Sequence, residues 1–317
     1  MSSASNNQGR GYEYICLMSL YKAIKAVRPA CVLKNSSYNA AHSAWNTLSD
    51  NEKFLYELSA KSTIKTIFSM EPNIIENSEI PLKLFIQTDE HGEDGDVRDI
   101  IIERDEIRWE IGLSIKHNHM AVKHSRLAKN LDFGSKWYNI KCSDQYWEEV
   151  KPIFDFLDSE KEKGTYFRDL RSKEDDVYIP LLNAFSKEIK TQVDTHAEIP
   201  KALVEYLLSK YDFYKVISVD AKRITTIQSF NMYGSLNLPS KEKEPDIIVP
   251  KIELPTSLLH IGFKPKSKTT ILMCFDNGWQ FSFRIHNAKD VVESSLKFDI
   301  QIIGMPTEVN IKHICEW

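Results

Sequence analysis

Several features that would assign a protein to a class at once are absent from this sequence. The chain has only five cysteines among its 317 residues. They are widely spaced in the sequence, and their odd number would leave at least one without a disulfide partner in the chain. This pattern argues against a disulfide framework and is typical of reduced thiols in a cytoplasmic protein. No apolar stretch approaches the roughly 20 residues of a membrane span, and the N-terminus lacks the apolar core of a signal peptide. We therefore expect a cytoplasmic protein that does not contact a membrane.

An excess of positive charge is also missing, since the formal net charge is −4 at pH 7. That value argues against a DNA-binding protein only until the charge is followed along the chain. Residues 89–110 contain ten acidic side chains against three arginines, whereas residues 116–141 contain six lysines or arginines against one acid. Acidic groups that collect a metal ion, followed by basic groups that collect phosphate, are what a nuclease cleft requires. For any single lysine, a solvated charged surface remains the alternative.

Two neighbouring segments predict a pair of strands that carries a metal-dependent site. In the first, Asp99 directly precedes a run of three isoleucines. In the second, apolar and polar residues alternate, which places them on opposite faces of a strand. The apolar face comprises Ile107, Trp109, Ile111, Leu113 and Ile115, and the polar face comprises Arg108, Glu110, Gly112, Ser114 and Lys116. Residues 103–106 are expected to join the strands, so Asp99 lies opposite a residue between Glu110 and Ser114 and can face the same metal ion as Lys116.

These residue types suit the magnesium-dependent hydrolysis of a phosphodiester. Magnesium draws charge from phosphate oxygens and is bound by carboxylates, and a lysine can orient or help deprotonate the attacking water. We therefore expect Asp99 to bind Mg²⁺ and Lys116 to position the water. Asp96 is the alternative to Asp99, which is preferred because the buried strand begins directly after it. In a purely structural interpretation, Asp99 is the soluble end of a buried strand and Lys116 protects a sheet edge.

The order of these residues resembles the signature of the PD-(D/E)xK nuclease superfamily, in which an Asp opens one strand and an acid, any residue and a lysine follow on the next. Here Ser114 stands in place of the second acid, so another carboxylate must complete the catalytic and metal-binding site. The candidates are Glu110 on the same strand face, Glu13 near the N-terminus and, in third place, Asp132. Glu110 and Glu13 rank equally. Glu110 can contribute only if the strand register places it across from Asp99. Glu13 resembles the helix glutamate that binds the metal in many such nucleases.

Longer segments resemble a narrower family, the HaeIII-type restriction endonucleases. The segments that carry this resemblance are Ser5–Arg10, Lys34–Tyr38, Ala44–Ser49, Gly95–Ile102, Trp109–Arg126 and Phe281–Ala288. The resemblance implies a type II enzyme of a restriction-modification system that cuts duplex DNA at the palindrome GGCC with Mg²⁺, leaves 5′-phosphate and 3′-hydroxyl ends, and has a cognate DNA methyltransferase. A palindromic target favours a symmetric homodimer. The alternative function is a non-catalytic, sequence-specific DNA-binding protein on a degenerate nuclease fold, which Ser114 supports.

The basic tract after the second strand predicts contacts to DNA. His117 and His119 follow the strand, and a helix that begins near Met120 would place Lys123 and Arg126 on one side, along a DNA backbone. No cysteine pairs accompany the histidines, and their spacing fits no common zinc site. Phosphate or base contacts are therefore expected for these side chains.

The C-terminal part of the chain predicts a β-hairpin for DNA recognition. Strands at 270–275 and 279–285 flank the tripeptide Asp-Asn-Gly, a tight-turn signal because Asn-Gly accepts positive φ. On the second strand the apolar side chains point one way, and four polar ones, including Arg284 and His286, point the other. A β-ribbon can enter the major groove, where an arginine reads guanine, so Arg284 is the first choice for base recognition, with His286 beside it. Three lysines just before the hairpin are expected to hold phosphates, namely Lys264, Lys266 and Lys268.

These segments predict an α/β fold, with a mixed β-sheet nuclease core flanked by helices, a helical insertion and a C-terminal β-rich region. We expect the nuclease core at 1–140, the helical region at 141–212, and the β-rich region with the recognition hairpin at 213–317. Apolar residues recur at helical spacing in the middle region, where core packing explains them. The stretch 237–257, which is rich in proline and in alternating charges, is expected to be an extended linker or arm.

Overall fold

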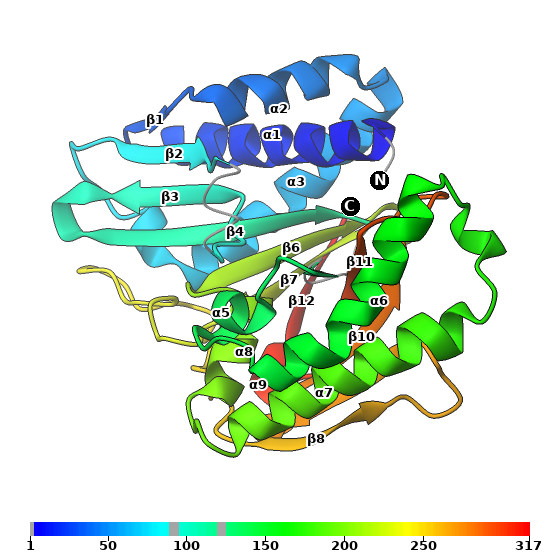
Figure 1. Cartoon of the computed structure of the whole chain (residues 1–317). Coiled ribbons are helices and arrows are strands. Elements are labelled where there is room, and N and C mark those ends of the chain that lie inside the picture. Colours follow the sequence, from blue (N-terminus) through cyan, green and yellow to red (C-terminus); the bar gives the residue numbers. More distant parts are fainter. Residues whose placement is uncertain (1–2, 89–94, 119–124) are drawn as a thin grey trace. The chain divides into compact units, whose positions relative to one another are not determined.

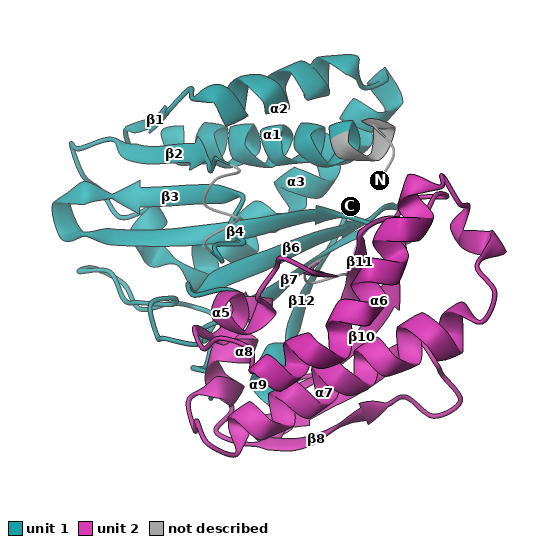
Figure 2. Ribbon diagram, viewed as in Figure 1, with its two compact units in different colours: residues 1–120, 209–253, 307–317 teal, residues 121–208, 254–306 magenta. Residues whose placement is uncertain are grey.

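The protein is described by a computed structural model that covers residues 3–88, 95–118 and 125–317. These residues belong to two compact units (Figure 2). Unit 1 comprises residues 1–120, 209–253 and 307–317, and unit 2 comprises residues 121–208 and 254–306. Each unit combines helices with a β-sheet, which confirms the predicted α/β class. Both units are discontinuous in sequence, so this grouping differs from a division at residues 140 and 212.

The centre of unit 1 is a seven-stranded sheet in the order β1-β2-β3-β4-β6-β7-β12 (Figure 1). Its strands are β1 (Ala30–Val32), β2 (Leu82–Ile86), β3 (Ile100–Arg104), β4 (Trp109–His117), β6 (Phe213–Val219), β7 (Ile224–Phe230) and β12 (Lys312–Glu316). The pairs β1–β2 and β4–β6 are parallel and the other neighbours are antiparallel, so the sheet is mixed, as predicted. β6 and β7, which were expected in the C-terminal β-rich region, extend this sheet because β6 completes the hydrogen bonds of the free edge of β4.

One face of this sheet is covered by the helices α1 and α3, while α2 packs against α1 (Figure 1). The helices are α1 (Ser3–Lys25), α2 (Ser36–Thr47) and α3 (Asp50–Met70), and the short α9 (Thr307–Asn310) follows near the C-terminus. α3 begins with a capping box, in which the Ser49 hydroxyl accepts a hydrogen bond from the Glu52 amide and the Glu52 carboxylate accepts one from the Ser49 amide. This reciprocal pair satisfies two backbone donors that the helix itself leaves open, which fixes where α3 starts.

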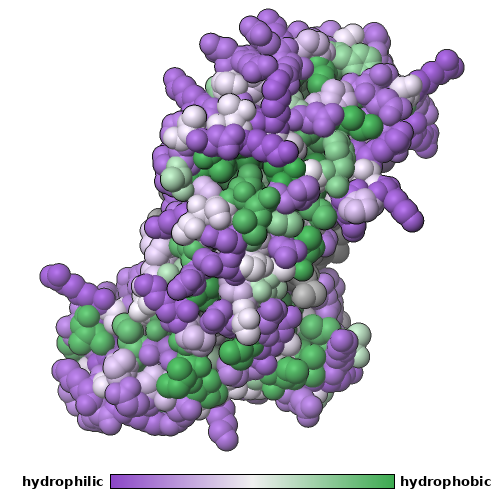
Figure 3. Space-filling model, turned by 90° about the horizontal axis from the view of Figure 1, so that it is seen from below, coloured by the Kyte–Doolittle hydropathy of each residue, from purple (hydrophilic) through white to green (hydrophobic). Residues whose placement is uncertain are grey.

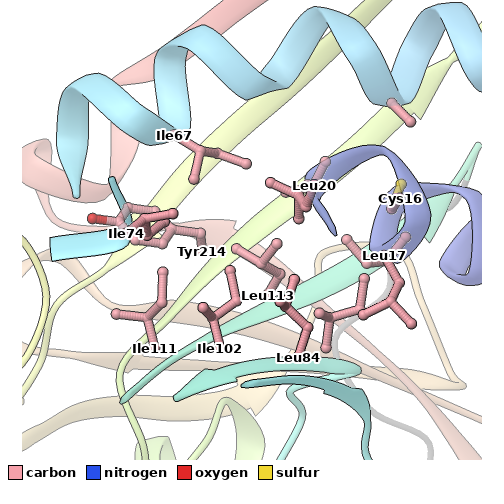
Figure 4. Close-up of a cluster of buried hydrophobic side chains, with 14 of the residues drawn as sticks. Cys16, Leu17, Leu20, Ile67, Ile74, Leu84, Ile102, Ile111, Leu113 and Tyr214 are labelled. Carbon is pink, nitrogen blue, oxygen red and sulfur yellow. The ribbon is translucent and has the colours of Figure 1, made fainter. Parts of the chain in front are cut away.

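Apolar side chains of the strands and helices meet in the core of unit 1 (Figure 4). They include Leu84, Ile102, Ile111, Leu113 and Tyr214 from the strands, Cys16, Leu17 and Leu20 from α1, and Ile67 from α3. The alternation expected along β4 is confirmed from Trp109 onward. Ile107 is an exception, since it lies in a 3₁₀ turn before the strand and is 37% exposed. Arg108 adopts a positive φ of 51°, so the strand begins only after it.

The stretch 237–257, expected to be a linker or arm, contains no helix or strand among its residues, all of which the structure describes. Its first part is nevertheless packed. Val249 and Ile252 are 6% and 1% exposed. The Asn237 side-chain amide donates to the carbonyl oxygens of Met70 at 2.7 Å and of Ile247 at 2.9 Å. The expected linker or arm is therefore packed on unit 1 over this part, where buried apolar residues and the hydrogen bonds of Asn237 hold it.

Unit 2 contains an antiparallel sheet in the order β5-β11-β10-β9-β8 (Figure 1). Its strands are β5 (Arg126–Ala128), β8 (Leu258–Phe263), β9 (Thr270–Phe275), β10 (Gln280–His286) and β11 (Ser295–Gly304), and its helices are α5 (Phe133–Tyr138), α6 (Asp144–Glu162), α7 (Ile179–Val193) and α8 (Ile199–Leu207). The predicted hairpin is confirmed as β9 and β10. Asn277 and Gly278 in its turn have φ values of 54° and 85°, which an Asn-Gly pair tolerates.

The helix predicted to begin near Met120 is wrong over residues 126–128. These residues form β5, in which Leu127 pairs with Leu296 of β11 and is fully buried. A pattern with one buried residue between two partly exposed ones suits a short strand, and pairing with β11 outweighs the charge spacing that suggested a helix. Residues 119–124, which include the start of the expected helix, lie outside the described part of the chain.

Hydrophilic side chains predominate on the face shown in Figure 3, with hydrophobic areas among them. Of the helices that the structure describes, none is long and apolar enough to cross a membrane. The five cysteines are free thiols, as their spacing predicted.

Candidate active site

Asp99 lies where the chain enters β3, beside the end of β4. The register of these two strands places Asp99 across from Ser114, within the predicted range. Its Oδ2 accepts hydrogen bonds from the Ile115 amide at 2.6 Å and the Lys116 ammonium at 2.9 Å, and a longer one from the Ser114 hydroxyl at 3.4 Å. No described residue donates a hydrogen bond to Oδ1 of Asp99. One oxygen of this carboxylate is therefore open to a further ligand.

Lys116 interacts with two carboxylates, of which one comes from a distant part of the chain. Its side chain is 29% exposed. Burial lowers the pKa of Lys116, but attraction by Asp99 and Glu13 outweighs this effect and raises it. Glu13 lies on α1, which packs against β4. The buried Cys16, one turn further along α1, also interacts with both acids, which together with burial raise the pKa of its thiol. The charge of Glu13 on α1 therefore acts on Lys116, the lysine that is paired with Asp99.

Glu110 and Asp96 belong to a different cluster, which surrounds Arg98. The Arg98 guanidinium donates to Asp96 Oδ1 at 2.9 Å and Oδ2 at 2.8 Å, and to Glu110 Oε1 at 2.8 Å. It also lies over the ring of Tyr211, with 4.2 Å between the guanidinium carbon and the ring centroid. Burial lowers the pKa of Arg98, but the two carboxylates raise it more strongly. Both acids are thus engaged by this arginine, whereas Asp99 is the acid bonded to the lysine of β4.

Lys215 was missed from the sequence, yet the fold brings it beside the same site. β6 pairs in parallel with β4, and Lys215 lies in register with Ser114 on the sheet face that carries Lys116. Lys215 is only 7% exposed. Burial, together with repulsion from neighbouring lysines, Lys116 first, lowers the pKa of Lys215 to about 8, while Asp99 opposes the shift. The signal in the sequence is a single lysine inside the otherwise largely apolar segment 213–219.

His117, expected to contact DNA, is hydrogen-bonded within unit 1 through both ring nitrogens. Nε2 lies 2.7 Å from Asp220 Oδ2, and Nδ1 lies 3.3 Å from the Tyr56 hydroxyl. The ring packs against Tyr12 and Tyr56, and the side chain is 10% exposed. A DNA contact by His117 would require one of these bonds to be exchanged. His119 and Lys123 lie outside the described residues.

Asp132, the third candidate acid, caps a helix of unit 2. Its carboxylate accepts hydrogen bonds from the amide of Ser135 at 2.9 Å and of Cys142 at 3.2 Å. Burial raises the pKa of Asp132, but these hydrogen bonds lower it more. Capping the N-terminus of α5 accounts for an acid at this position without a metal ion.

The proposed recognition strand presents Arg284 to solvent. The Arg284 side chain is 60% exposed, and its Nη2 lies 3.3 Å from Oδ2 of Asp299 on the neighbouring strand β11. His286, two residues further on the same face, is partly buried. Burial lowers the pKa of His286, and the positive charge of Arg284 lowers it further. An exposed ion pair of this kind contributes little stability, so Arg284 can exchange Asp299 for another acceptor.

The other basic side chains expected to bind DNA differ in how many ion pairs and hydrogen bonds they form within the protein. Lys264 and Lys266 are exposed in the turn between β8 and β9. Lys268 forms ion pairs with Glu174 at 3.3 Å and with Asp175 at 3.1 Å. Arg126 donates to the Ser295 hydroxyl at 2.8 Å and keeps 39% of its side chain exposed. The turn lysines are therefore the more accessible of the expected phosphate contacts.

Few of the described side chains of unit 1 could bind a metal ion. No group of three His, Cys, Asp or Glu side chains in the described part of the chain is arranged to hold one. Mg²⁺ does not require such a group, since it is commonly bound by one or two carboxylates, waters and substrate phosphates. Asp99, with one carboxylate oxygen that accepts no hydrogen bond from the described residues, fits that smaller requirement, and Glu13, whose charge acts on Lys116, is the candidate for a second carboxylate.

Two comparisons with known proteins give a match. The family model described as HaeIII restriction endonuclease matches residues 9–306. The chain is 49% identical over 310 residues to the type II restriction enzyme HaeIII of Haemophilus aegyptius, an alignment that covers 98% of this chain and 97% of that enzyme. No solved structure was found to match the chain.

Proposed function

Because this chain belongs to the HaeIII restriction endonuclease family, which makes it a site-specific deoxyribonuclease, we propose that it cuts duplex DNA at the palindrome GGCC in a reaction that requires Mg²⁺. The observation that carries the proposed chemistry is the pair of Asp99 and Lys116, whose carboxylate oxygen and ammonium lie 2.9 Å apart on adjacent strands. The recognition sequence is supported by the family resemblance.

In this proposal, Asp99 binds the metal ion through Oδ1, the oxygen that accepts no hydrogen bond from the described residues. The Ile115 amide and the Lys116 ammonium hold Oδ2 and so fix the direction of the carboxylate. Magnesium, when bound, supplies positive charge that offsets the negative charge of the phosphate oxygens. Lys116 donates a hydrogen bond to the attacking water and orients it toward phosphorus.

We assign the second carboxylate of the site to Glu13. The attraction between its carboxylate and Lys116, the lysine that donates to Asp99, supports this assignment. Glu110, in contrast, accepts a hydrogen bond from Arg98 at 2.8 Å. Ser114 stands where the superfamily has an acid, and its hydroxyl donates a hydrogen bond to Asp99. The role of the missing acid is then filled from α1.

Recognition is assigned to the hairpin of unit 2. Arg284 has an exposed guanidinium that suits the two acceptor atoms of guanine in the major groove, and His286 lies on the same face. Lys264 and Lys266 hold phosphates from the adjacent turn, with Arg126 as a further contact. A two-fold symmetric target is matched by two copies of the chain, so the active species is a homodimer. A methyltransferase that modifies the same sequence is the expected companion, since it would protect the host DNA.

The test is the cleavage of a plasmid that contains GGCC sites, with Mg²⁺ and with a chelator. Asp99→Asn should abolish cleavage while the protein stays folded and still binds DNA in Ca²⁺. Asp105→Asn is the matched control, because Asp105 follows the other end of β3, is 52% exposed and pairs with Lys83. The control should cut like the wild type. A folded Asp99→Asn variant that cuts at a near-normal rate would refute the assignment, and a wild type that binds GGCC without cutting would favour the non-catalytic alternative that Ser114 suggests.

A further inference from the structure

β12 forms one edge of the unit 1 sheet and, among the described strands, pairs only with β7 (Figure 1). Just past β12, the Trp317 amide donates to the carbonyl oxygen of Arg223 at 3.0 Å, which continues the pairing with β7. In an antiparallel pair, the backbone groups that bond to one neighbour belong to every second residue. The residues in step with Trp317 therefore bond to β7, and the other residues direct their N–H and C=O groups outward. The outward residues are Lys312, Ile314 and Glu316.

The side chains of these three residues are exposed as well. Ile314 is 63% exposed, and Lys312 and Glu316 are exposed on either side of it. Cys315 lies on the other face of the strand, where its thiol is 3.5 Å from the Thr66 hydroxyl of α3. Neither Lys312 nor Glu316 forms an ion pair with a described residue. The outward edge therefore carries an apolar side chain between two unpaired charges of opposite sign.

This edge is complementary to itself. If two copies of β12 pair antiparallel about Ile314, Lys312 of each copy lies opposite Glu316 of the partner subunit. Each of these residue pairs consists of outward residues, so its members can exchange two backbone hydrogen bonds. Charges on an edge strand commonly prevent pairing with other strands. Here a second copy is the strand that matches both charges at once.

The register also determines which side of the paired sheet carries the two active sites. Ile314 is in register with Thr226 of β7, and Thr226 with Ile217 of β6. Ile217 is in turn in register with Lys116. Residues in register share one side of a sheet, within one copy and across a pair of strands. Pairing of two β12 strands therefore places both Lys116 positions on the same side of one continuous sheet, as the two strands of one duplex require.

We propose that the outward edge of β12 is the surface through which two copies of this chain form the homodimer. The inference rests on the proposed function, which calls for two copies at a two-fold symmetric target. A contact made by one short strand is smaller than a stable interface, which buries roughly 1,200–2,000 Å². The dimer therefore forms on a GGCC duplex, where the DNA holds two copies close together, and dissociates in dilute protein without DNA.

Sedimentation velocity in Ca²⁺ with a GGCC duplex counts the bound copies. Lys312→Glu and Glu316→Lys each place like charges opposite one another, so binding of the second copy should weaken at least about tenfold in each variant. The double variant exchanges the two charges and should return to within about threefold of the wild type. A general effect of net charge on DNA binding would instead shift the two single variants in opposite directions. Lys65→Glu, at an exposed lysine of α3, is the matched control and should bind the second copy like the wild type.

Ile314→Cys tests the register directly. Residues opposite each other in a hydrogen-bonded antiparallel pair have Cα atoms about 5.5 Å apart, within the range that a disulfide spans. Mild oxidation on a GGCC duplex should therefore link two chains of this variant. Ile248→Cys is the control, because Ile248 is 72% exposed elsewhere on unit 1, and its chains should stay unlinked.

Two bound copies, losses in both single variants and recovery in the double variant support the inference. If two copies bind but the single variants match the wild type, or the double variant does not recover, another surface forms the dimer. If one copy binds and the plasmid is still cut, the homodimer and this inference fail while the proposed cleavage stands. If two copies bind with the expected pattern but do not cut with Mg²⁺, the proposed cleavage fails and the β12 interface stands.

Discussion

The substitution Gly112→Ala tests how the strand beside the active site is held. A Cβ at position 112 would lie 2.0 Å from Cδ, 2.5 Å from Cγ and 2.8 Å from Cβ of Arg98. These atoms belong to the base of the arginine side chain, so rotation of its far end does not relieve the overlap. Either Arg98 or the strand must move. Asp99 directly follows Arg98 in the chain, so we expect a displacement of Arg98 to reach the active site.

The size of the effect follows from what Arg98 holds. Its side chain and that of Asp96 are 7% and 6% exposed, and they lie 2.8 Å apart. Removing one partner of a buried pair costs roughly 3–5 kcal/mol, because a charge is left without compensation. The second partner, Glu110, is 42% exposed and adds at most about 1 kcal/mol. We therefore expect Gly112→Ala to lower the free energy of unfolding by about 3–5 kcal/mol. A shift of Asp99 by about 1 Å would slow cleavage roughly 100-fold.

Urea unfolding and single-turnover cleavage of a GGCC duplex measure the two effects. Gly9→Ala is the control, since no atom lies within 4 Å of a Cβ there and an alanine in α1 should be neutral or slightly stabilising. In an Arg98→Ala background the further loss from Gly112→Ala should be much smaller, because most of the overlapping atoms are gone. If Gly112→Ala is as stable as the wild type and cuts at the same rate, Arg98 does not occupy this space in solution and the argument fails.

Three other predictions concern the acids and the recognition hairpin. Burial raises the pKa of Glu71 from 4.5 to about 7, so its contribution to stability is complete below about pH 4.5 and is lost as the pH rises through 7. Between pH 5 and pH 8 the wild type should lose about 3 kcal/mol of unfolding free energy from this group, and Glu71→Gln should not show that loss. If the difference in unfolding free energy between the two pH values is the same in the variant as in the wild type, the prediction is contradicted. Glu13→Gln should reduce Mg²⁺-dependent cutting far more than Glu110→Gln, and the reverse order would reassign the second carboxylate. Arg284→Ala should lose about 1–3 kcal/mol of binding to GGCC in Ca²⁺ mainly at one base position, whereas Lys266→Ala should weaken all sequences alike and flatten the salt dependence. Equal losses on matched and mismatched duplexes would remove Arg284 as the reading residue.

Short residue patterns in the sequence were sufficient to predict the elements that depend only on neighbouring residues. β9 occupies the predicted residues, because an apolar run that ends at a turn signal identifies a strand. The approach of Lys116 to Asp99 also followed from local reasoning, since a short loop joins the two strands and limits the register. The expected helix near residue 126 failed for the opposite reason. Spacing of charges is a weak guide where a distant strand, here β11, supplies the pairing.

The rest of the site depends on contacts that local patterns do not encode. Lys215 joins the site through a parallel pair of strands that are far apart in sequence, and no periodicity of β6 states which strand it will pair with. Glu110 and Glu13 were equal candidates because each depends on a partner that the fold supplies. Arg98 binds Glu110, and the packing of α1 on β4 brings Glu13 toward Lys116. A charged residue inside an apolar strand is therefore a signal that something charged lies on the neighbouring strand or binds there, and only the register identifies it.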